Sequence, residues 1–156
     1  MQKISPFLWF DTQAEEAANF YVSIFKNSRI RRIARNGEQG PGPAGSVLVV
    51  SFELDGQQFT ALNGGPQFKF TEAISLVVDC ADQAEVDHMW ERLGEGGQPG
   101  VCGWLKDRYG LSWQIVPVEF MQMATDPDPA KVGRVMGAMM QMTKMDIAKL
   151  REAFEG

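Results

Sequence analysis

The chain has 156 residues, a net charge of −5, and 44% hydrophobic against 22% charged residues, which is the size and composition of a folded globular domain. It has no run of about 18 apolar residues, so no membrane span is expected. It also lacks the pattern of a secretory signal peptide. The two cysteines, Cys80 and Cys102, form no CxxC pair. We therefore expect a cytoplasmic protein, with no membrane partner, whose cysteines are small buried side chains.

The first half of the chain predicts a strand, a helix and three more strands. Apolar or alternating segments indicate the strands, and an amphipathic segment indicates the helix. A capping box at residues 12–15 opens the helix. Asp55-Gly56 predicts a tight hairpin between the last two strands. The predicted strands span residues 4–10, 29–35, 46–54 and 58–62.

One of these strands carries the chain's cluster of basic residues, which are Arg29, Arg31, Arg32 and Arg35. Such a cluster can mark a nucleic-acid surface. The acidic total charge favours instead a solvated strand face. No nucleic-acid partner is therefore expected.

The second half repeats the order of elements. Ile4-Ser5 recurs as Ile74-Ser75, and residues 13–15 recur as residues 83–85, both at an offset of 70 residues. A constant offset and a constant element order indicate a duplicated unit. Strands are predicted at residues 73–79, 101–106 and 111–116, and a second capped helix begins at Asp82. The second copy is truncated, with at most a strand stub at residues 96–100.

The chain after residue 118 changes in character. Seven of the nine methionines lie within residues 121–145, on segments with helical periodicity. We expect helices that pack on the sheet or on a partner subunit, although methionine-rich surfaces can also bind varied ligands. The predicted organisation is α+β: duplicated βαβββ modules at residues 1–66 and 67–118, forming one domain (1–118), followed by a helical extension (119–156).

Several segments resemble a known family. The chain is similar to the vicinal oxygen chelate superfamily, which includes glyoxalase I, extradiol dioxygenases and bleomycin-resistance proteins, and specifically to its PhnB-like or 3-demethylubiquinone-9 3-methyltransferase-like branch. The longest matching segment, residues 103–117, is the most specific. The segments that carry the resemblance are residues 20–25, 61–66, 73–76, 82–87 and 103–117.

The resemblance implies a metal site that this chain lacks the residues to build. Metal-using members place a histidine or similar ligand on the first strand of each half and a glutamate on the last. Here the first strands offer Ser5 and Ser75, residues 58–63 contain no glutamate, and Gln114 stands at the last glutamate position. The one histidine, His88, belongs to a helix surface. Neutral hydroxyl and amide groups do not hold a divalent ion tightly, so we expect no metal and no other cofactor.

The methyltransferase label has no direct support in the motifs. A nucleoside methyl donor commonly binds a glycine-rich loop between a strand and a helix. Neither glycine cluster has this placement: residues 37–45 precede a strand, and Gly64-Gly65 precede residues 68–70 rather than a helix. Both clusters therefore predict turns.

Two functions remain open: a metal-free small-molecule-binding protein, or an enzyme, either a methyltransferase as the family label implies or an isomerase or lyase. Strand parity predicts a cup with aromatic walls and neutral hydrogen-bonding groups. The alternative is that these residues are structural, with the tryptophans in the core. We also expect a homodimer, as the resemblance implies. The candidate ligand-binding residues are Ser5, Trp9, Asn63, Ser75, Trp104 and Gln114.

Overall fold

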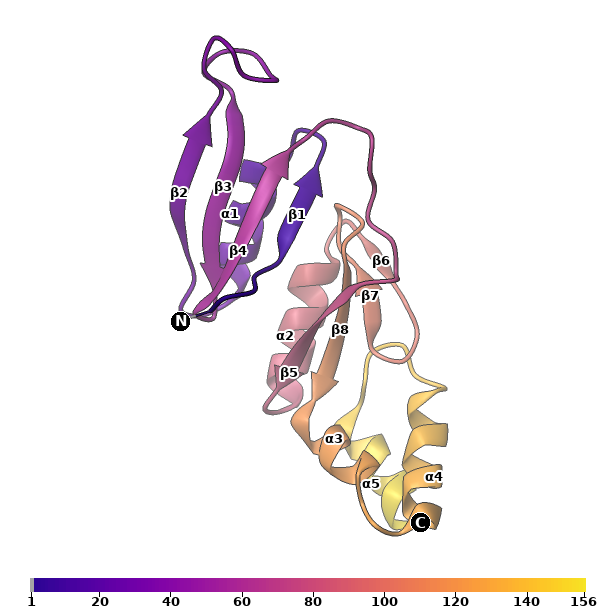
Figure 1. Cartoon of the computed structure of the whole chain (residues 1–156). Helices are drawn as coiled ribbons and strands as arrows, with labels where there is room; N and C mark the ends of the chain where they lie inside the picture. The colour runs from indigo at the N-terminus through magenta and orange to yellow at the C-terminus, as the bar shows by residue number, and fades with distance from the viewer. Residues whose placement is uncertain (1) are drawn as a thin grey trace. The chain divides into compact units, whose positions relative to one another are not determined.

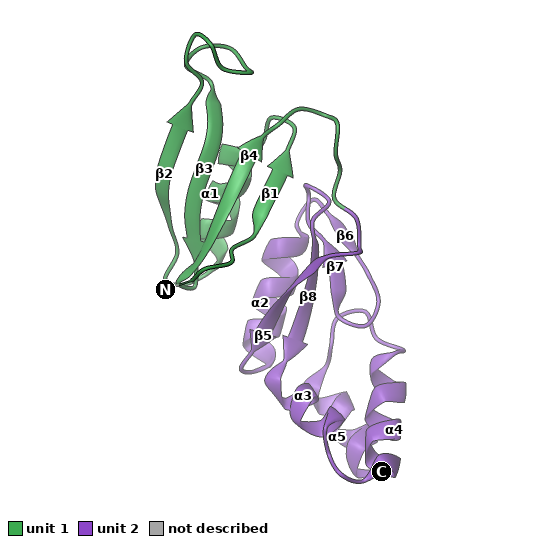
Figure 2. Cartoon of the chain, viewed as in Figure 1, with its two compact units in different colours: residues 1–70 green, residues 71–156 purple. Residues whose placement is uncertain are grey.

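The computed structural model describes residues 2–156, which form two compact units that meet between Phe70 and Thr71 (Figure 2). Each unit has its own sheet and its own helix packed on that sheet, so each is described by itself. Within the described residues, no helix is long and apolar enough to cross a membrane.

Unit 1 is a four-stranded sheet with one helix on one face (Figure 1). The strand order is β1-β4-β3-β2, with β1 parallel to β4 and the other neighbours antiparallel. The helix packs mainly against β3 and β4. The elements are β1 (Phe7–Phe10), α1 (Ala14–Ile24), β2 (Arg29–Arg35), β3 (Val47–Leu54) and β4 (Gln57–Asn63).

Unit 2 repeats this arrangement. Its strand order is β5-β8-β7-β6, and β5 is parallel to β8 as β1 is to β4. The predicted duplication and the α+β class are therefore confirmed, and so is the strand stub, which is the two-residue β6. The elements are β5 (Ser75–Cys80), α2 (Gln83–Gly94), β6 (Gln98–Pro99), β7 (Trp104–Lys106), β8 (Ser112–Pro117), α3 (Val118–Ala124), α4 (Pro129–Met139) and α5 (Ile147–Glu155).

Alternation along the strands separates each sheet into a helix-facing side and an opposite side. In β3, Val50, Phe52 and Leu54 are buried under α1, as the sequence pattern predicts, while Ser51 and Glu53 between them are only partly buried. The β3–β4 turn uses Asp55 and Gly56, both with positive φ (49° and 79°), which is the geometry of the predicted two-residue hairpin.

The two helices start differently, although both sequences contain a capping-box pattern. In unit 2, Asp82 accepts a hydrogen bond from the Glu85 N–H, and the Glu85 carboxylate accepts one from Ala81. In unit 1, the predicted capping box at residues 12–15 is wrong, because the N-cap residue is Gln13 and its side chain forms no capping bond.

A residue from β4 caps α1 instead. The Asn63 Oδ1 accepts a hydrogen bond from the Ala14 N–H at 2.8 Å, and its Nδ2 donates to the Val47 carbonyl at 3.0 Å. The helix start needs such an acceptor, because its first N–H groups have no partner within the helix. Asn63 thus ties α1 to both β4 and β3.

The C-terminal helices are part of unit 2. Their core contains Phe120, Met123, Val135 and Leu150, and it continues into β8 through Val116. The segment before α5 is also bonded to the first part of the unit. Cys102 and Gly103 donate to the carbonyls of Met142 and Thr143, each at 2.8 Å, and the Gln83 side chain bonds to Met145 and Ile147.

Cys102 and Gly103 lie in the turn between β6 and β7. The backbone donors of this turn are therefore satisfied by the segment before α5.

We predict that Asn63→Ala lowers the free energy of unfolding by about 1–3 kcal/mol, because it leaves the start of α1 without its acceptor. Chemical denaturation of the whole chain measures this loss. Asn19→Ala, on the exposed side of α1, is the matched control and should cause no loss. Equal stability of the two variants would show that Asn63 does not hold the helix start.

Candidate functional site

The side of each sheet that faces away from its helix carries the residues of interest. In unit 1, the strand register aligns side chains in rows across this side. One row, the hydroxyl row, consists of Arg32, Ser51 and Thr60 and reaches Phe7 on β1. The neighbouring row, the apolar row, consists of Val49, Leu62 and Trp9.

A hollow of about 230 Å³ opens beside the hydroxyl row. Ser5, a candidate ligand-binding residue, lies at its wall. Alternation would normally place consecutive residues of β2 on opposite sides. A register shift between Ile30 and Arg32 breaks the alternation, so both Arg31 and Arg32 line the hollow. The lining residues are Ser5, Arg31, Arg32, Ser51, Phe52, Gln58, Phe59 and Thr60.

The Trp9 ring is held rigidly at the end of the apolar row. Its Nε1 donates to the Gly65 carbonyl at 2.9 Å, and its ring meets Phe68 edge-on at 4.9 Å. Gly64 is required here, because a Cβ at this position would lie 2.4 Å from the indole. The segment after β4 therefore does more than form the predicted turn: it positions Trp9 on the side of the sheet away from α1.

Asn63 belongs to the opposite side. Asn63 is two residues after Ala61 on β4, so its side chain points to the same side of the sheet as that of Ala61, which is fully buried under α1. Both polar groups of the Asn63 amide bond to the backbone of unit 1. The structure thus brings Ser5 and Trp9 to the same side of the unit 1 sheet and places Asn63 at the start of α1.

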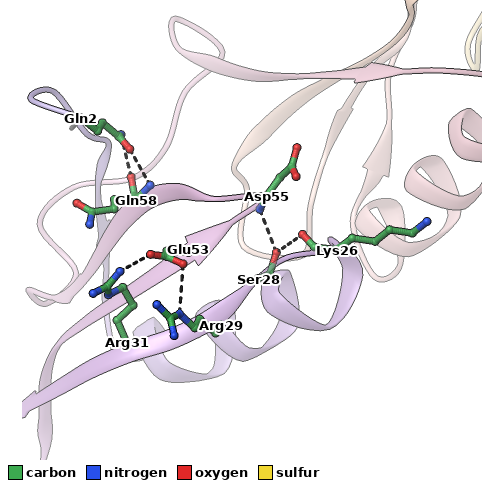
Figure 3. A network of polar contacts seen from close by, with 8 residues as sticks. All are labelled: Gln2, Lys26, Ser28, Arg29, Arg31, Glu53, Asp55 and Gln58. Atoms are coloured by element: carbon green, nitrogen blue, oxygen red, sulfur yellow. Dashed lines mark hydrogen bonds and ion pairs between the residues drawn. The ribbon is translucent and has the colours of Figure 1, made fainter.

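An ion-pair cluster (Figure 3) shares Arg31 with the lining of the hollow. Both Arg29 and Arg31 pair with the Glu53 carboxylate. The bond from Arg31, together with the charge of Arg29, lowers the pKa of Glu53 below its usual value, so this carboxylate stays charged at neutral pH. At the end of β4, the Gln2 side chain accepts a bond from the Gln58 N–H and donates to its carbonyl.

In unit 2, three of the predicted residues are neighbours. Gln114 pairs in register with Trp104 on β7 and with Val77 on β5, and its Nε2 donates to the Ser75 Oγ at 2.9 Å. All three lie on the side away from α2. Trp113, by contrast, is buried, and its Nε1 donates to the Asp107 carboxylate at 2.9 Å.

Strand parity places Ser112 on the same face as Gln114, but Ser112 was not among the candidate ligand-binding residues. It lies opposite Ser75 in the register. Its Oγ is buried and has no hydrogen-bond partner in the described part of the chain. Such groups are uncommon, because burial without a partner costs free energy.

A second ion pair flanks this group. Lys106, the register partner of Ser112 on β7, pairs with Glu72, and this contact lowers the pKa of Glu72. Because Lys106 and Glu72 neutralise each other, the pair adds no net charge beside the neutral side chains of Ser75, Ser112 and Gln114.

These residues do not fit the metal that the superfamily resemblance implies. The positions offer hydroxyl and amide groups only, whereas transition ions prefer imidazole, thiolate and carboxylate ligands. Over residues 2–156, no three His, Cys, Asp or Glu side chains lie together as a metal site would require. His88 lies exposed on α2. Burial raises the pKa of Cys80 to about 12, with the nearby acidic side chains adding to the shift, so this thiol is neither an anionic ligand nor a nucleophile at neutral pH.

Comparison with known proteins identifies the family and the fold of the chain. The model of the 3-demethylubiquinone-9 3-methyltransferase family matches residues 2–116. A PhnB protein from Bacillus cereus is 40% identical; the match covers 75% of this chain and all of that one, with a TM-score of 0.70. No curated protein matches.

More distant structures share the fold. A Pseudomonas aeruginosa protein is 19% identical over 75% of this chain and 98% of its own, with a TM-score of 0.63. An Arabidopsis thaliana gene product is 16% identical over 74% of this chain and 98% of its own, with a TM-score of 0.51. The region that the family model matches, residues 2–116, includes the strands of both sheets and stops before α3. The chain therefore belongs to the PhnB-like, 3-demethylubiquinone-9 3-methyltransferase family.

Proposed function

We propose that the protein binds a small, flat, partly polar molecule on the unit 2 sheet, on the side away from α2, without a catalytic metal. The observation that carries the proposal is the hydrogen-bonded pair of Ser75 and Gln114 beside Trp104, all three partly exposed. The amide and the hydroxyl can bond to a polar group of a ligand, and the indole of Trp104 offers an apolar wall. Ser112 is fully buried, so it does not itself contact a ligand. Ligand sites commonly combine aromatic walls with a few such polar groups.

The sequence offers only three candidate acid–base groups for such a site, Asp79, Glu53 and Tyr109, and this argues for binding over catalysis. General acid–base catalysis needs a group that titrates near neutral pH within reach of the substrate. Asp79 is exposed at the end of β5. Glu53 is held in its charged form by Arg31 and Arg29. The family description favours an enzyme, a methyltransferase, and this remains the second candidate function, ahead of an isomerase or lyase.

The proposal includes a homodimer. Two pairs of apolar residues related by the offset of 70, Ile4 with Ile74 and Phe7 with Val77, have exposed fractions of 55–89%. Both modules thus leave corresponding positions uncovered, one in the edge strand (β1 or β5) and one in the segment just before it, which is typical of surfaces that pack in an assembly. A cytoplasmic location is also part of the proposal, since Cys80 and Cys102 are both free thiols.

We predict that phenol, catechol or duroquinone raises the melting temperature of the protein and that Gln114→Ala weakens this binding about fivefold, because one hydrogen bond is lost. Isothermal titration with the best of the three measures the affinity. Gln122→Ala, exposed on α3, is the control and should bind as the parent does. Stabilisation by S-adenosylmethionine that Gln114→Ala abolishes would instead favour the methyltransferase.

We predict that light scattering of the parent at micromolar concentration gives the mass of a dimer and that Ile74→Glu shifts it toward the monomer, because a charge cannot be buried unpaired in an apolar interface. Ala73→Glu adds the same charge at the neighbouring exposed residue and should leave the dimer intact. A monomeric parent would refute the dimer, and equal masses for both variants would place its interface elsewhere.

A further inference from the structure

We infer that the hollow of unit 1 is a binding site for a small organic oxyanion with a flat apolar body, such as an aromatic acid. This inference shares with the proposed function only the use of a sheet side that no helix covers. It concerns a different unit and different residues, so each can fail without the other.

The first observation is an arginine without a carboxylate. Glu53 neutralises part of the charge of Arg29 and Arg31 (Figure 3). Within the described residues, Arg32 has no ion pair, although it lines the hollow. An arginine guanidinium suits carboxylate and phosphate oxygens because its N–H groups form two parallel bonds to them.

The second observation is the set of hydroxyls beside this guanidinium. Ser51 pairs in register with Arg32, and Thr60 pairs with Ser51. Both side chains are only partly exposed, and neither forms a side-chain hydrogen bond within the described part of the chain. Ser5 adds a third hydroxyl to the lining. The three can donate to the oxygens of an anion that Arg32 binds.

The third observation is the change from polar to apolar along the strands. The apolar row of Val49, Leu62 and Trp9 follows the hydroxyl row two residues further along each strand, a displacement of about 7 Å. This separation matches the length of a benzene ring with one acidic group. Val49, two residues from Ser51 on β3, is the member of this row nearest to Arg32, and Trp9 lies three strands away. The apolar part of a ligand bound to Arg32 would therefore rest against Val49, beyond the residues that line the hollow.

The size of the hollow limits the ligand. Its volume of about 230 Å³ lies below the roughly 300–1,000 Å³ of pockets for drug-sized molecules. A single-ring acid fits this limit, whereas a nucleoside cofactor does not. The acid group can be a carboxylate or a phosphate, since both present the same oxygens to Arg32.

The test compares three probes of similar shape on the full-length protein by isothermal titration: benzoate, phenyl phosphate and the uncharged benzamide. We expect benzoate or phenyl phosphate to bind at up to about 10 mM, as suits a shallow site, and the stronger of them identifies the acid group. Benzamide should bind at least about tenfold more weakly, because it lacks the charge. Benzamide binding as tightly as benzoate, or no binding by either anion, would overturn the inference.

Variants locate the site. Arg32→Gln should weaken anion binding about tenfold, and Thr60→Val should weaken it about threefold by removing one donor. Arg35→Gln removes the same charge from the same strand, but Arg35 bonds to the Gly45 carbonyl and does not line the hollow, so it should change affinity less than about twofold. If Arg32→Gln and Arg35→Gln weaken anion binding equally, the arginines act only through long-range electrostatic attraction, and a specific binding site at the hollow is refuted.

One further variant separates this inference from the proposed function. Gln114→Ala, in unit 2, should leave benzoate binding unchanged. If Gln114→Ala abolishes it and Arg32→Gln does not, the anion binds in unit 2 and the unit 1 site is refuted.

Discussion

In each unit, a single helix covers one side of a four-stranded sheet, and this one-sided packing is the constraint on which the rest of the structure depends. The strands must alternate, so that Val50 and Phe52 can be buried under α1 while Ser51 and Glu53 point the other way. The same alternation makes Ile115 core and leaves Gln114 on the uncovered side. Polar residues on that side are therefore free to serve binding without disturbing the core.

The two modules have used this freedom differently. The register equates Thr60 in unit 1 with Gln114 in unit 2, since their β1 and β5 partners, Phe7 and Val77, are related by the offset of 70. Around Thr60 the sheet is cationic and bears hydroxyls. Around Gln114 it is neutral, with a buried serine and an indole. The duplication thus conserves the scaffold while the chemistry of the uncovered sides diverges.

Much of this organisation can be predicted from the sequence. Local patterns identify the strands, the Asp55-Gly56 turn and the α2 cap, because these depend on neighbouring residues. Strand parity also separates Gln114 from its buried neighbours Trp113 and Ile115. The duplication was detectable through the constant offset.

What the sequence could not reveal depends on contacts between distant residues. The α1 cap comes from Asn63, which is 49 residues away from Ala14. The bulge in β2 that directs both Arg31 and Arg32 toward the hollow is recognised only from the pairing of β2 with β3. The hydrogen bonds from Cys102 and Gly103 to the carbonyls of Met142 and Thr143 form only when the C-terminal helices pack on unit 2, which the local sequence does not show. Ser112 is an ordinary strand residue until its burial is known.

Neutral hydroxyl and amide groups stand at the positions where the superfamily resemblance implies metal ligands. Elemental analysis of the protein, purified without an affinity tag and without chelators, shows whether they hold an ion. We expect substoichiometric amounts of zinc, nickel, iron and manganese, because serine, threonine and glutamine side chains supply neither charge nor imidazole. One tightly bound transition ion per chain, retained through dialysis, would contradict this expectation.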